Sequence, residues 1–327
     1  MHLNLHKKAY KKVLLIANGY EPYYDDVSKL AESVHYIDPY SQDKNYIQSL
    51  KTFKKYLEDN NLDSESTKII YGSGLEDKIG IQEYLDNEFS IAGNSFSKYR
   101  YLSNIYNLDE AIFNKKISLP ETSKSYHYKY LSKKYNSSGG LHVGNNIFSE
   151  NIYYQKYLPG KTYSISFIAN GEYSKILGLN QLFLVKDNIK FPFLHSGAMN
   201  LGLSEANIDF PKNFISSICN LYQIKGYCSI DFKIIDNKIY ILDFNPRLSS
   251  SYRLYTRKYE NLMHHHLGLI DNELNMISNQ YYAYIILYAK KDLVVSDSIN
   301  ELENISDKPT IGDSINCLLY TSPSPRD

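Results

Sequence analysis

The sequence lacks the features that mark several large classes of protein. It contains no tryptophan and three cysteines, Cys219, Cys228 and Cys317, which form no disulfide framework and fit a reducing cytoplasm. No apolar run approaches the length of a transmembrane helix, and the apolar stretch 13–17 is too short for the core of a signal peptide. We therefore expect a cytoplasmic protein without a membrane partner.

An excess of charge is also missing. The chain has 36 basic and 36 acidic residues, a formal net charge of zero, and no basic block. Binding to a nucleic acid or to an anionic membrane surface is therefore not suggested. At 327 residues, the chain is long enough for two or three domains with cores of their own.

The first part of the chain alternates between strand and helix patterns. We expect strands at 13–17, 34–37, 68–71 and 89–92, and helices at 25–33 and 46–62. This alternation predicts an α/β unit with a parallel, doubly wound sheet. Further along, we expect a helix at 96–113 and an amphipathic helix at 211–223.

A glycine turn follows the third expected strand. Its sequence, Gly72-Ser73-Gly74-Leu75-Glu76, resembles part of a dinucleotide-binding fingerprint. It lacks the third glycine and an acidic residue at the distance that ribose binding requires. A tight turn between a strand and a helix is the better interpretation.

The stretch 226–247, GYCSIDFKIIDNKIYILDFNPR, predicts two strands joined by a short turn. Asp231 lies in the first strand, and Asp243 and Asn245 end the second strand on one face. If the strands pair, three oxygen-bearing side chains converge, and such ligands suit Mg²⁺. Acidic residues at strand ends are also common as solvated turn residues, and that alternative stays open.

Two further segments carry groups that can bind anions. Arg247 offers a planar donor fork for a carboxylate or phosphate. Lys133 closes an expected strand and precedes a small polar loop, which contains Ser137, Ser138, Gly139 and Gly140. Glycine backbone can approach a phosphate closely, although many loops of this composition are ordinary turns.

The pattern D-F, a short gap and a hydrophobic strand ending in acidic-x-N-P-R resembles the metal-binding end of the ATP-grasp superfamily. The longer form LDFNPRLSSSY is similar to ATP-dependent carboligases related to biotin carboxylase. Most members have Glu where this chain has Asp243, which keeps the charge and shortens the reach by one methylene. The resemblance covers residues 12–316.

The resemblance implies a fold and a domain plan. Residues 1–95 would form a Rossmann-like, pre-ATP-grasp α/β domain with a parallel sheet, and residues 96–270 a two-subdomain α+β ATP-grasp fold. Residues 271–316 would form a small C-terminal subdomain. Residues 317–327 read as a non-native tail of sequencing-adapter type, so we expect the natural C-terminus to be truncated.

The resemblance also assigns roles to residues. It places the nucleotide on Lys133 and on the glycine flap, which consists of Ser137, Ser138, Gly139 and Gly140. It places the adenosine at a hinge that includes Gln155, Tyr157 and Leu158. Mg²⁺, or Mn²⁺ in its place, would be held by Asp231, Asp243 and Asn245. Asp231 and Arg247 would be the catalytic residues.

The implied function is that of an ATP-dependent ligase. Such an enzyme activates a small-molecule carboxylate as an acyl phosphate with ATP and Mg²⁺, and an amine or thiol then displaces the phosphate. Two alternatives remain, a biotin-carboxylase-like carboxylation and a non-catalytic ATP-binding regulatory protein. Substrate specificity would lie in loops near Ser73, His195 and 249–252, where no motif names a molecule. The architecture is compatible with a homodimer.

Overall fold

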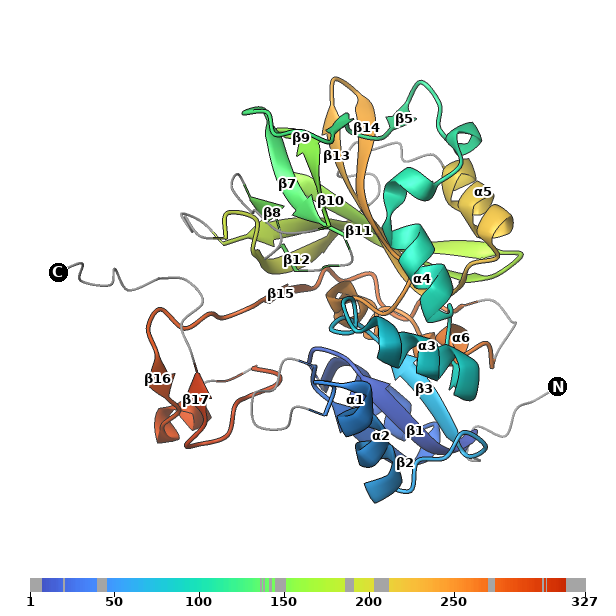
Figure 1. Cartoon of the computed structure of the whole chain (residues 1–327), viewed down its shortest axis with the longest axis vertical. Coiled ribbons are helices and arrows are strands. Elements are labelled where there is room, and N and C mark those ends of the chain that lie inside the picture. Colours follow the sequence, from blue (N-terminus) through green and yellow to red (C-terminus); the bar gives the residue numbers. More distant parts are fainter. Residues whose placement is uncertain are drawn as a thin grey trace.

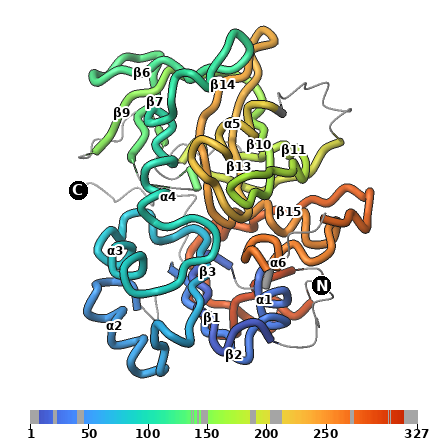
Figure 2. Tube along the Cα trace, turned by 90° about the vertical axis from the view of Figure 1, so that its right-hand side faces the viewer, coloured from blue at the N-terminus to red at the C-terminus, as the bar shows by residue number. Residues whose placement is uncertain are grey.

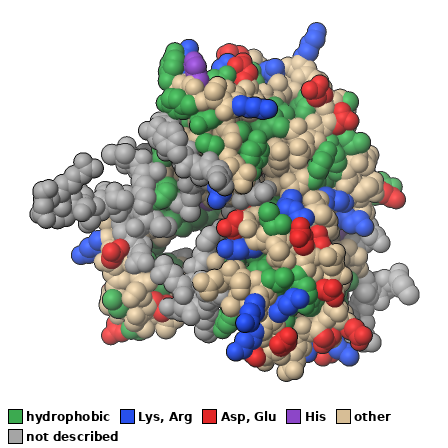
Figure 3. Space-filling view, viewed as in Figure 1, with side chains coloured by type: hydrophobic (Ala, Val, Ile, Leu, Met, Phe, Trp, Pro, Cys, Tyr) green, Lys and Arg blue, Asp and Glu red, His purple; other side chains and the backbone are tan. Residues whose placement is uncertain are grey.

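The computed structural model describes residues 8–19, 21–39, 46–135, 137, 139–140, 143–144, 151–185, 191–202, 212–269, 274–301, 303 and 305–315. The predicted tail 317–327 and Cys317 lie outside these residues. Acidic and basic side chains are interspersed on the face shown in Figure 3, in line with the zero net charge.

The N-terminal unit contains a parallel sheet of four strands in the order β2-β1-β3-β4. The strands are β1 (Tyr10–Ile16), β2 (Ala31–Ile37), β3 (Thr67–Tyr71) and β4 (Ser90–Ile91). The helices are α1 (Glu21–Ser28), α2 (Leu50–Asp59) and α3 (Ile79–Glu88). Because helices cover the sheet, the apolar run at the end of β1 is fully buried. The predicted parallel α/β unit is confirmed.

The predicted helix 25–33 is displaced toward the N-terminus. Helix α1 ends at Ser28, and β2 begins at Ala31 in parallel register with β1. Ala31 and Ser33 therefore pair in the sheet and do not belong to the helix, since pairing with a buried strand outweighs local helix preference.

A seven-stranded sheet dominates the second half of the molecule, in the order β15-β12-β11-β10-β13-β14-β5 (Figure 1). Its strands are β5 (Ile117–Ser118), β10 (Thr162–Asn170), β11 (Ser174–Leu184), β12 (His195–Leu201), β13 (Lys225–Ile235), β14 (Lys238–Asn245) and β15 (Ala283–Ile285). Helix α5 (Lys212–Tyr222) buries Phe214, Ile215 and Ile218 in a core shared with β10 and β13.

A smaller antiparallel sheet, in the order β6-β9-β7-β8, accompanies the large one. Its strands are β6 (Thr122–Ser123), β7 (Tyr130–Lys134), β8 (Val143–Gly144) and β9 (Ile152–Lys156). Figure 1 shows β7 and β9 beside the β13–β14 hairpin. The predicted lysine, glycine flap and hinge all belong to this sheet or to its loops.

The expected helix 96–113 breaks into three pieces. Helix α4 (Phe96–Ser103) is followed by the 3₁₀ turns η1 (Ile105–Asn107) and η2 (Glu110–Ile112). The side chain of Asn104 accepts a hydrogen bond from the backbone N–H of Tyr106, and Asp109 accepts one from Ala111. Such short side-chain bonds compete with helix continuation, and they explain the breaks.

The two halves share a hydrophobic core. Val13, Leu15 and Tyr23 of the N-terminal unit pack with a group from the second half, namely Leu248, Tyr252, Tyr255 and Met263. This second group lies in or near η3 (Ser250–Leu254) and α6 (Leu262–His266). Figure 2 shows α6 between the N-terminal sheet and the large sheet.

The last described segment lies beside the N-terminal unit and contacts it near Gly19. After β15 come β16 (Leu293–Val294), η4 (Asp297–Glu301) and β17 (Ser314–Ile315). Figure 1 shows β16 and β17 to one side of the N-terminal unit. Because β15 pairs with β12, the segment after residue 271 contributes one strand to the large sheet.

Candidate functional site

The hairpin is built from β13 and β14, and its turn fixes the register. The two turn residues, Asp236 and Asn237, have φ of 50° and 61°, the left-handed pair that a two-residue hairpin requires. The turn register pairs Phe232 with Ile241, and a one-residue shift after this pair sets Asp231 directly opposite Asp243. Asn245 lies two residues beyond Asp243 on the same face. The structure therefore brings the three predicted metal ligands together.

A β-bulge in β14 brings the predicted lysine to the same place. The register shifts after Asp231, so that Leu242 has no partner in the β13–β14 ladder. Its carbonyl accepts a hydrogen bond of 3.0 Å from the Nζ of Lys133. The side chain of Lys133, which comes from β7, is buried. The ammonium group of Lys133 therefore lies near the carboxylates of Asp231 and Asp243, whose pKa values it lowers.

The pKa values of both carboxyl groups are raised, so their charged forms are disfavoured in the absence of a further cation. Burial raises the pKa of Asp231 to about 7, and the neighbouring Asp243 adds to the rise. Burial likewise raises the pKa of Asp243, while Lys133 and Arg247 lower it. A site of this kind gains free energy when a second cation binds, because the cation favours the charged form of both carboxyls.

The donor set fits Mg²⁺. Two carboxylates and one amide oxygen are hard ligands, and Mg²⁺ completes its shell with water and phosphate oxygens. Within the described residues, no group of three or more His, Cys, Asp or Glu side chains could hold a metal ion. A metal here would therefore rely on Asp231, Asp243 and Asn245, together with ligands from the nucleotide.

Arg247 holds a carboxylate of the protein itself. Its Nη2 lies 3.0 Å from Oε1 of Glu76, and the two side chains are 4% and 7% exposed. Its Nη1 donates to the carbonyl of Leu248, and its guanidinium lies 5.8 Å from the ring centre of Tyr99. Glu76 also accepts a bond from the backbone N–H of Gly74. The glycine turn is thus joined to the end of β14.

Glu76 did not figure among the predicted site residues. The available signal was an acidic residue directly after a glycine turn. Its partner, Arg247, lies 171 residues further along the chain, a pairing that no local pattern reveals.

The flap glycines lie against the start of β12. The carbonyl of Gly139 accepts a hydrogen bond of 3.2 Å from the backbone N–H of His195. Gly140 has φ of +81°, and a Cβ built there would lie 1.9 Å from the carbonyl oxygen of Phe193. Ser137 lines a small cavity together with Lys133, Asp243 and Asn245. Ser138 lies outside the described residues.

The predicted hinge residues are arranged differently from one another. Gln155 is buried, and its amide donates to the hydroxyl of Tyr106 at 2.9 Å. Tyr157 is exposed, and its backbone N–H donates to the carbonyl of Lys129. The carbonyl of Leu158 accepts a bond from a lysine of the large sheet.

That lysine, Lys233, is a second residue that the sequence analysis missed. Its Nζ donates to the carbonyl of Leu158 at 2.6 Å and to that of Gly160 at 2.9 Å. It lies two residues after Asp231 on β13, and so on the same face. A lysine within an apolar strand was the only signal in the sequence.

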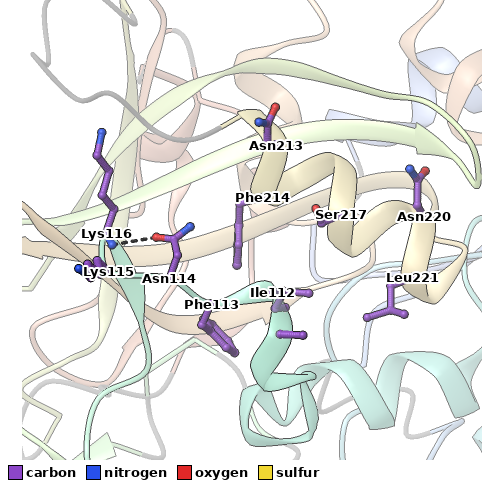
Figure 4. A pocket seen from close by; sticks show the side chains of 11 residues that line it. Ile112, Phe113, Asn114, Lys115, Lys116, Asn213, Phe214, Ser217, Asn220 and Leu221 are labelled. Carbon is purple, nitrogen blue, oxygen red and sulfur yellow. Dashed lines mark hydrogen bonds between the residues drawn. The ribbon is translucent and has the colours of Figure 1, made fainter.

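A wide, open hollow of about 1050 Å³ lies elsewhere (Figure 4). It is lined by residues 111–116 and by the face of α5 that carries Asn213, Ser217 and Asn220. None of its lining residues is acidic, and it contains none of the predicted site residues. The paired carboxylates therefore mark the candidate active site, in preference to the larger hollow.

Comparison with known protein families decides the identity of this region. Residues 102–251 match the family model of the ATP-grasp domain. The matched segment contains Lys133, the glycine flap, the hinge and the whole β13–β14 hairpin. The chain contains an ATP-grasp domain.

Two curated proteins of Methanocaldococcus jannaschii resemble the chain. An uncharacterized protein is 27% identical over 247 residues, which cover 67% of this chain and 59% of that protein. Tyramine–L-glutamate ligase is 28% identical over 123 residues, which cover 38% of this chain and 37% of the ligase. The chain therefore matches less than two thirds of the length of either relative.

A solved structure shows the same fold. The complex of biotin carboxylase from Campylobacter jejuni with β,γ-ATP superposes with a TM-score of 0.61 at 12% identity, and it covers 86% of this chain and 76% of the other. The predicted resemblance and fold class are confirmed, and the ATP-grasp match agrees with the predicted class of ATP-dependent ligase. The domain limits and the roles of single residues stay predictions.

The described helices also bear on the expected lack of a membrane segment. None of those in the part of the chain that the structure describes is both long and apolar enough to cross a bilayer.

Proposed function

We propose that the chain is a cytoplasmic ligase that uses ATP and Mg²⁺ to activate a small-molecule carboxylate as an acyl phosphate and to join it to an amine or thiol. The observation that carries this proposal is the pair Asp231 and Asp243, set face to face in an ATP-grasp domain with Lys133 beside them. Phosphoryl transfer depends on positioning and on neutralised charge more than on covalent help from the protein.

The metal site follows from the same pair. Asp231, Asp243 and Asn245 would hold Mg²⁺, with Mn²⁺ as an alternative ion. When bound, this ion would neutralise part of the charge on the nucleotide phosphates. Lys133 supplies a fixed positive charge at the same face, and its hydrogen bond to Leu242 holds it there.

The remaining predicted residues would bind and orient the nucleotide. The flap of Gly139 and Gly140 would cover the phosphates, since backbone N–H groups without a neighbouring Cβ can approach an anion. The hinge of Gln155, Tyr157 and Leu158 would receive the adenosine. Lys233 would keep that hinge in place through its two bonds to carbonyl groups.

Arg247 would act from a fixed position. Its bond to Glu76 is buried, which sets the direction of the guanidinium before any substrate arrives. Its charge lowers the pKa of Asp243, so its field reaches the proposed metal ligands. Charge fixed in advance stabilises a developing negative charge without reorganisation.

The similarity to tyramine–L-glutamate ligase supports formation of a carbon–nitrogen bond. The matched segment covers 37% of that ligase, so the similarity supports the type of bond and not a particular acid or amine.

The test is release of ADP and phosphate by the purified chain with ATP and Mg²⁺. A panel of carboxylates is supplied with and without amines, and bicarbonate alone forms a separate arm. We expect release that requires both a carboxylate and an amine or thiol. Release with bicarbonate alone would indicate carboxylation instead, and ATP binding without release across the panel would contradict the ligase proposal.

A further inference from the structure

The crevice at the carboxyl ends of the N-terminal strands is a place where α/β proteins bind ligands. In the order β2-β1-β3-β4, the strand order reverses between β1 and β3, and ligands of open α/β sheets bind outside such a switch point. Gly19 follows β1 and Gly72 follows β3. A Cβ on Gly72 would lie 3.4 Å from the carbonyl of Leu248, so the segment after β14 covers this crevice.

Arg253 enters the crevice from η3 with unused donor capacity. Its Nε is buried and has no hydrogen-bond partner among the described residues. Its guanidinium lies 4.8 Å from the ring centre of Tyr284. The nearest carboxylate is that of Asp307, with Oδ2 at 4.0 Å from Nη2. That distance is too long for a hydrogen bond, so the fork of donors is not saturated.

The surroundings favour an anion at this point. Asp307 comes from the C-terminal segment and reaches a gap left by Gly19, where a Cβ would lie 2.8 Å from its Oδ2. His195 contacts the hydroxyl of Tyr284 at 2.9 Å. Burial and the nearby Arg253 lower the pKa of His195 to about 4, which leaves that ring neutral. Arg253, and not His195, therefore supplies the positive charge that faces Asp307.

A chain of hydroxyl groups leads from the proposed metal face to η3. Ser229 lies opposite Asn245 in the hairpin register. Its hydroxyl contacts that of Ser249 at 3.1 Å, and Ser249 contacts Ser251 of η3 at 2.9 Å. Arg253 lies two residues further along η3. The hydroxyl chain ends at Ser251, and the backbone of η3 leads from there to Arg253.

We propose that Arg253, with Tyr284, His195 and the gap at Gly19, forms a subsite for a carboxylate of the substrate that is not the one activated. Asp307 stands in for that carboxylate when no substrate is bound. A planar guanidinium binds a carboxylate through two parallel bonds, which a loose contact of 4.0 Å does not provide. The role of the subsite in ligation rests on the proposed function.

The substrate class follows from the chemistry of the subsite. The carboxylate that is bound but not activated belongs either to a dicarboxylic acid or to an amino acid that serves as the amine. Two matched pairs of probes separate these sources, namely succinate against butyrate and L-alanine against ethylamine. The first pair tests the acid substrate, and the second tests the amine substrate.

The experiment measures binding of the four probes to the full chain by calorimetry in the presence of Mg²⁺ and ADP. We expect succinate to bind more tightly than butyrate, or L-alanine to bind more tightly than ethylamine. In each pair, the weaker ligand lacks the carboxylate that Arg253 would hold. Arg253→Gln should weaken that binding about 10- to 100-fold, the usual worth of hydrogen bonds to a charged group. Arg253→Lys should retain part of the affinity, and Asp307→Asn should strengthen it.

The controls are the affinity for ADP and the melting temperature, which should match the wild type in all three variants. Equal binding of the carboxylate by wild type and Arg253→Gln would overturn the subsite, as would failure of both succinate and L-alanine to bind Asp307→Asn. ATP turnover distinguishes the two proposals. If the chain turns over ATP and Arg253→Gln leaves the KM for the carboxylate substrate unchanged, the subsite alone is overturned. If Arg253→Gln weakens binding of the carboxylate probe but the wild type shows no turnover, the ligase function alone is overturned.

Discussion

At the scale of single residues, the candidate site depends on charges that face each other across the fold. Strand alternation and the turn predicted that Asp231, Asp243 and Asn245 converge, but the direct pairing of Asp231 with Asp243 depends on the bulge at Leu242. The partner of Lys133 could not be predicted. It is a carbonyl exposed by a bulge, and bulges leave little trace in a single sequence.

The buried ion pair between Glu76 and Arg247 leads to a prediction on stability. Glu76→Gln removes the charge that compensates the guanidinium, and breaking such a pair costs about 3–5 kcal/mol. We expect the free energy of unfolding, measured with urea, to fall by about that amount.

Asp77→Asn is the matched control for this variant. Asp77 is the next residue, its side chain is 60% exposed, and its pair with Lys78 spans 3.6 Å. Exposed pairs contribute about 0–1 kcal/mol, so the control should unfold almost as the wild type does. Equal effects of the two substitutions would contradict the role given to the buried pair.

At the scale of elements, the strands were more predictable than the helices. Strands β1, β3, β13 and β14 follow from apolar runs and turn residues. The helix expected at 96–113 failed at Asn104 and Asp109, where side chains bond to the backbone. The turn residues of the hairpin, Asp236 and Asn237, favour positive φ, which explains why the hairpin was the most readable element.

The two flap glycines offer a comparison within one element. Both have positive φ, +73° at Gly139 and +81° at Gly140, but a Cβ on Gly139 would meet nothing within 4 Å. A Cβ on Gly140 would meet the carbonyl oxygen of Phe193 at 1.9 Å. Gly140→Ala therefore forces the flap away from β12, whereas Gly139→Ala has only the strain of its backbone, about 1–2 kcal/mol.

We expect Gly140→Ala to raise the KM for ATP about tenfold or more over Gly139→Ala, which corresponds to about 1.4 kcal/mol of lost binding. Steady-state kinetics with varied ATP provides the comparison. A KM for ATP that is the same in both variants would mean that contact of the flap with β12 plays no part in holding the nucleotide.

At the scale of the whole molecule, the order of the two units could be predicted, but the interface between them could not. The ATP-grasp resemblance led to the domain order, but the contacts of α6 with the rest of the protein come from distant parts of the sequence. His266 of α6 accepts a hydrogen bond from the backbone N–H of Tyr227. A Cβ on Gly93 would lie 3.0 Å from its ring, and the glycine therefore permits the close packing.

This interface leads to a prediction on how the stability of the protein depends on pH. Burial lowers the pKa of His266 to about 3, because the ring would have to hold a charge away from water. Its ordinary pKa is 6.5 in the unfolded chain, so the stability that neutral His266 contributes is present above pH 6.5 and is lost as the pH falls toward 3.

The measurement is the free energy of unfolding by urea at pH 7 and at pH 5. We expect a decrease for the wild type of up to about 2 kcal/mol from this one group, at 1.36 kcal/mol for each pH unit below 6.5. His266→Gln cannot titrate in this range and should show a smaller decrease. An identical decrease in the variant would assign the pH effect to other groups.

The central claim is that the β13–β14 face binds a nucleotide together with a divalent cation. The most direct measurement is calorimetric titration of ADP into the full chain with and without Mg²⁺, for the wild type and for Asp243→Asn, which keeps the size of the side chain and removes its charge. We expect Mg²⁺ to tighten ADP binding to the wild type and to have little effect in Asp243→Asn. Equal tightening by Mg²⁺ in both proteins would contradict the assignment of this face as the nucleotide and metal site.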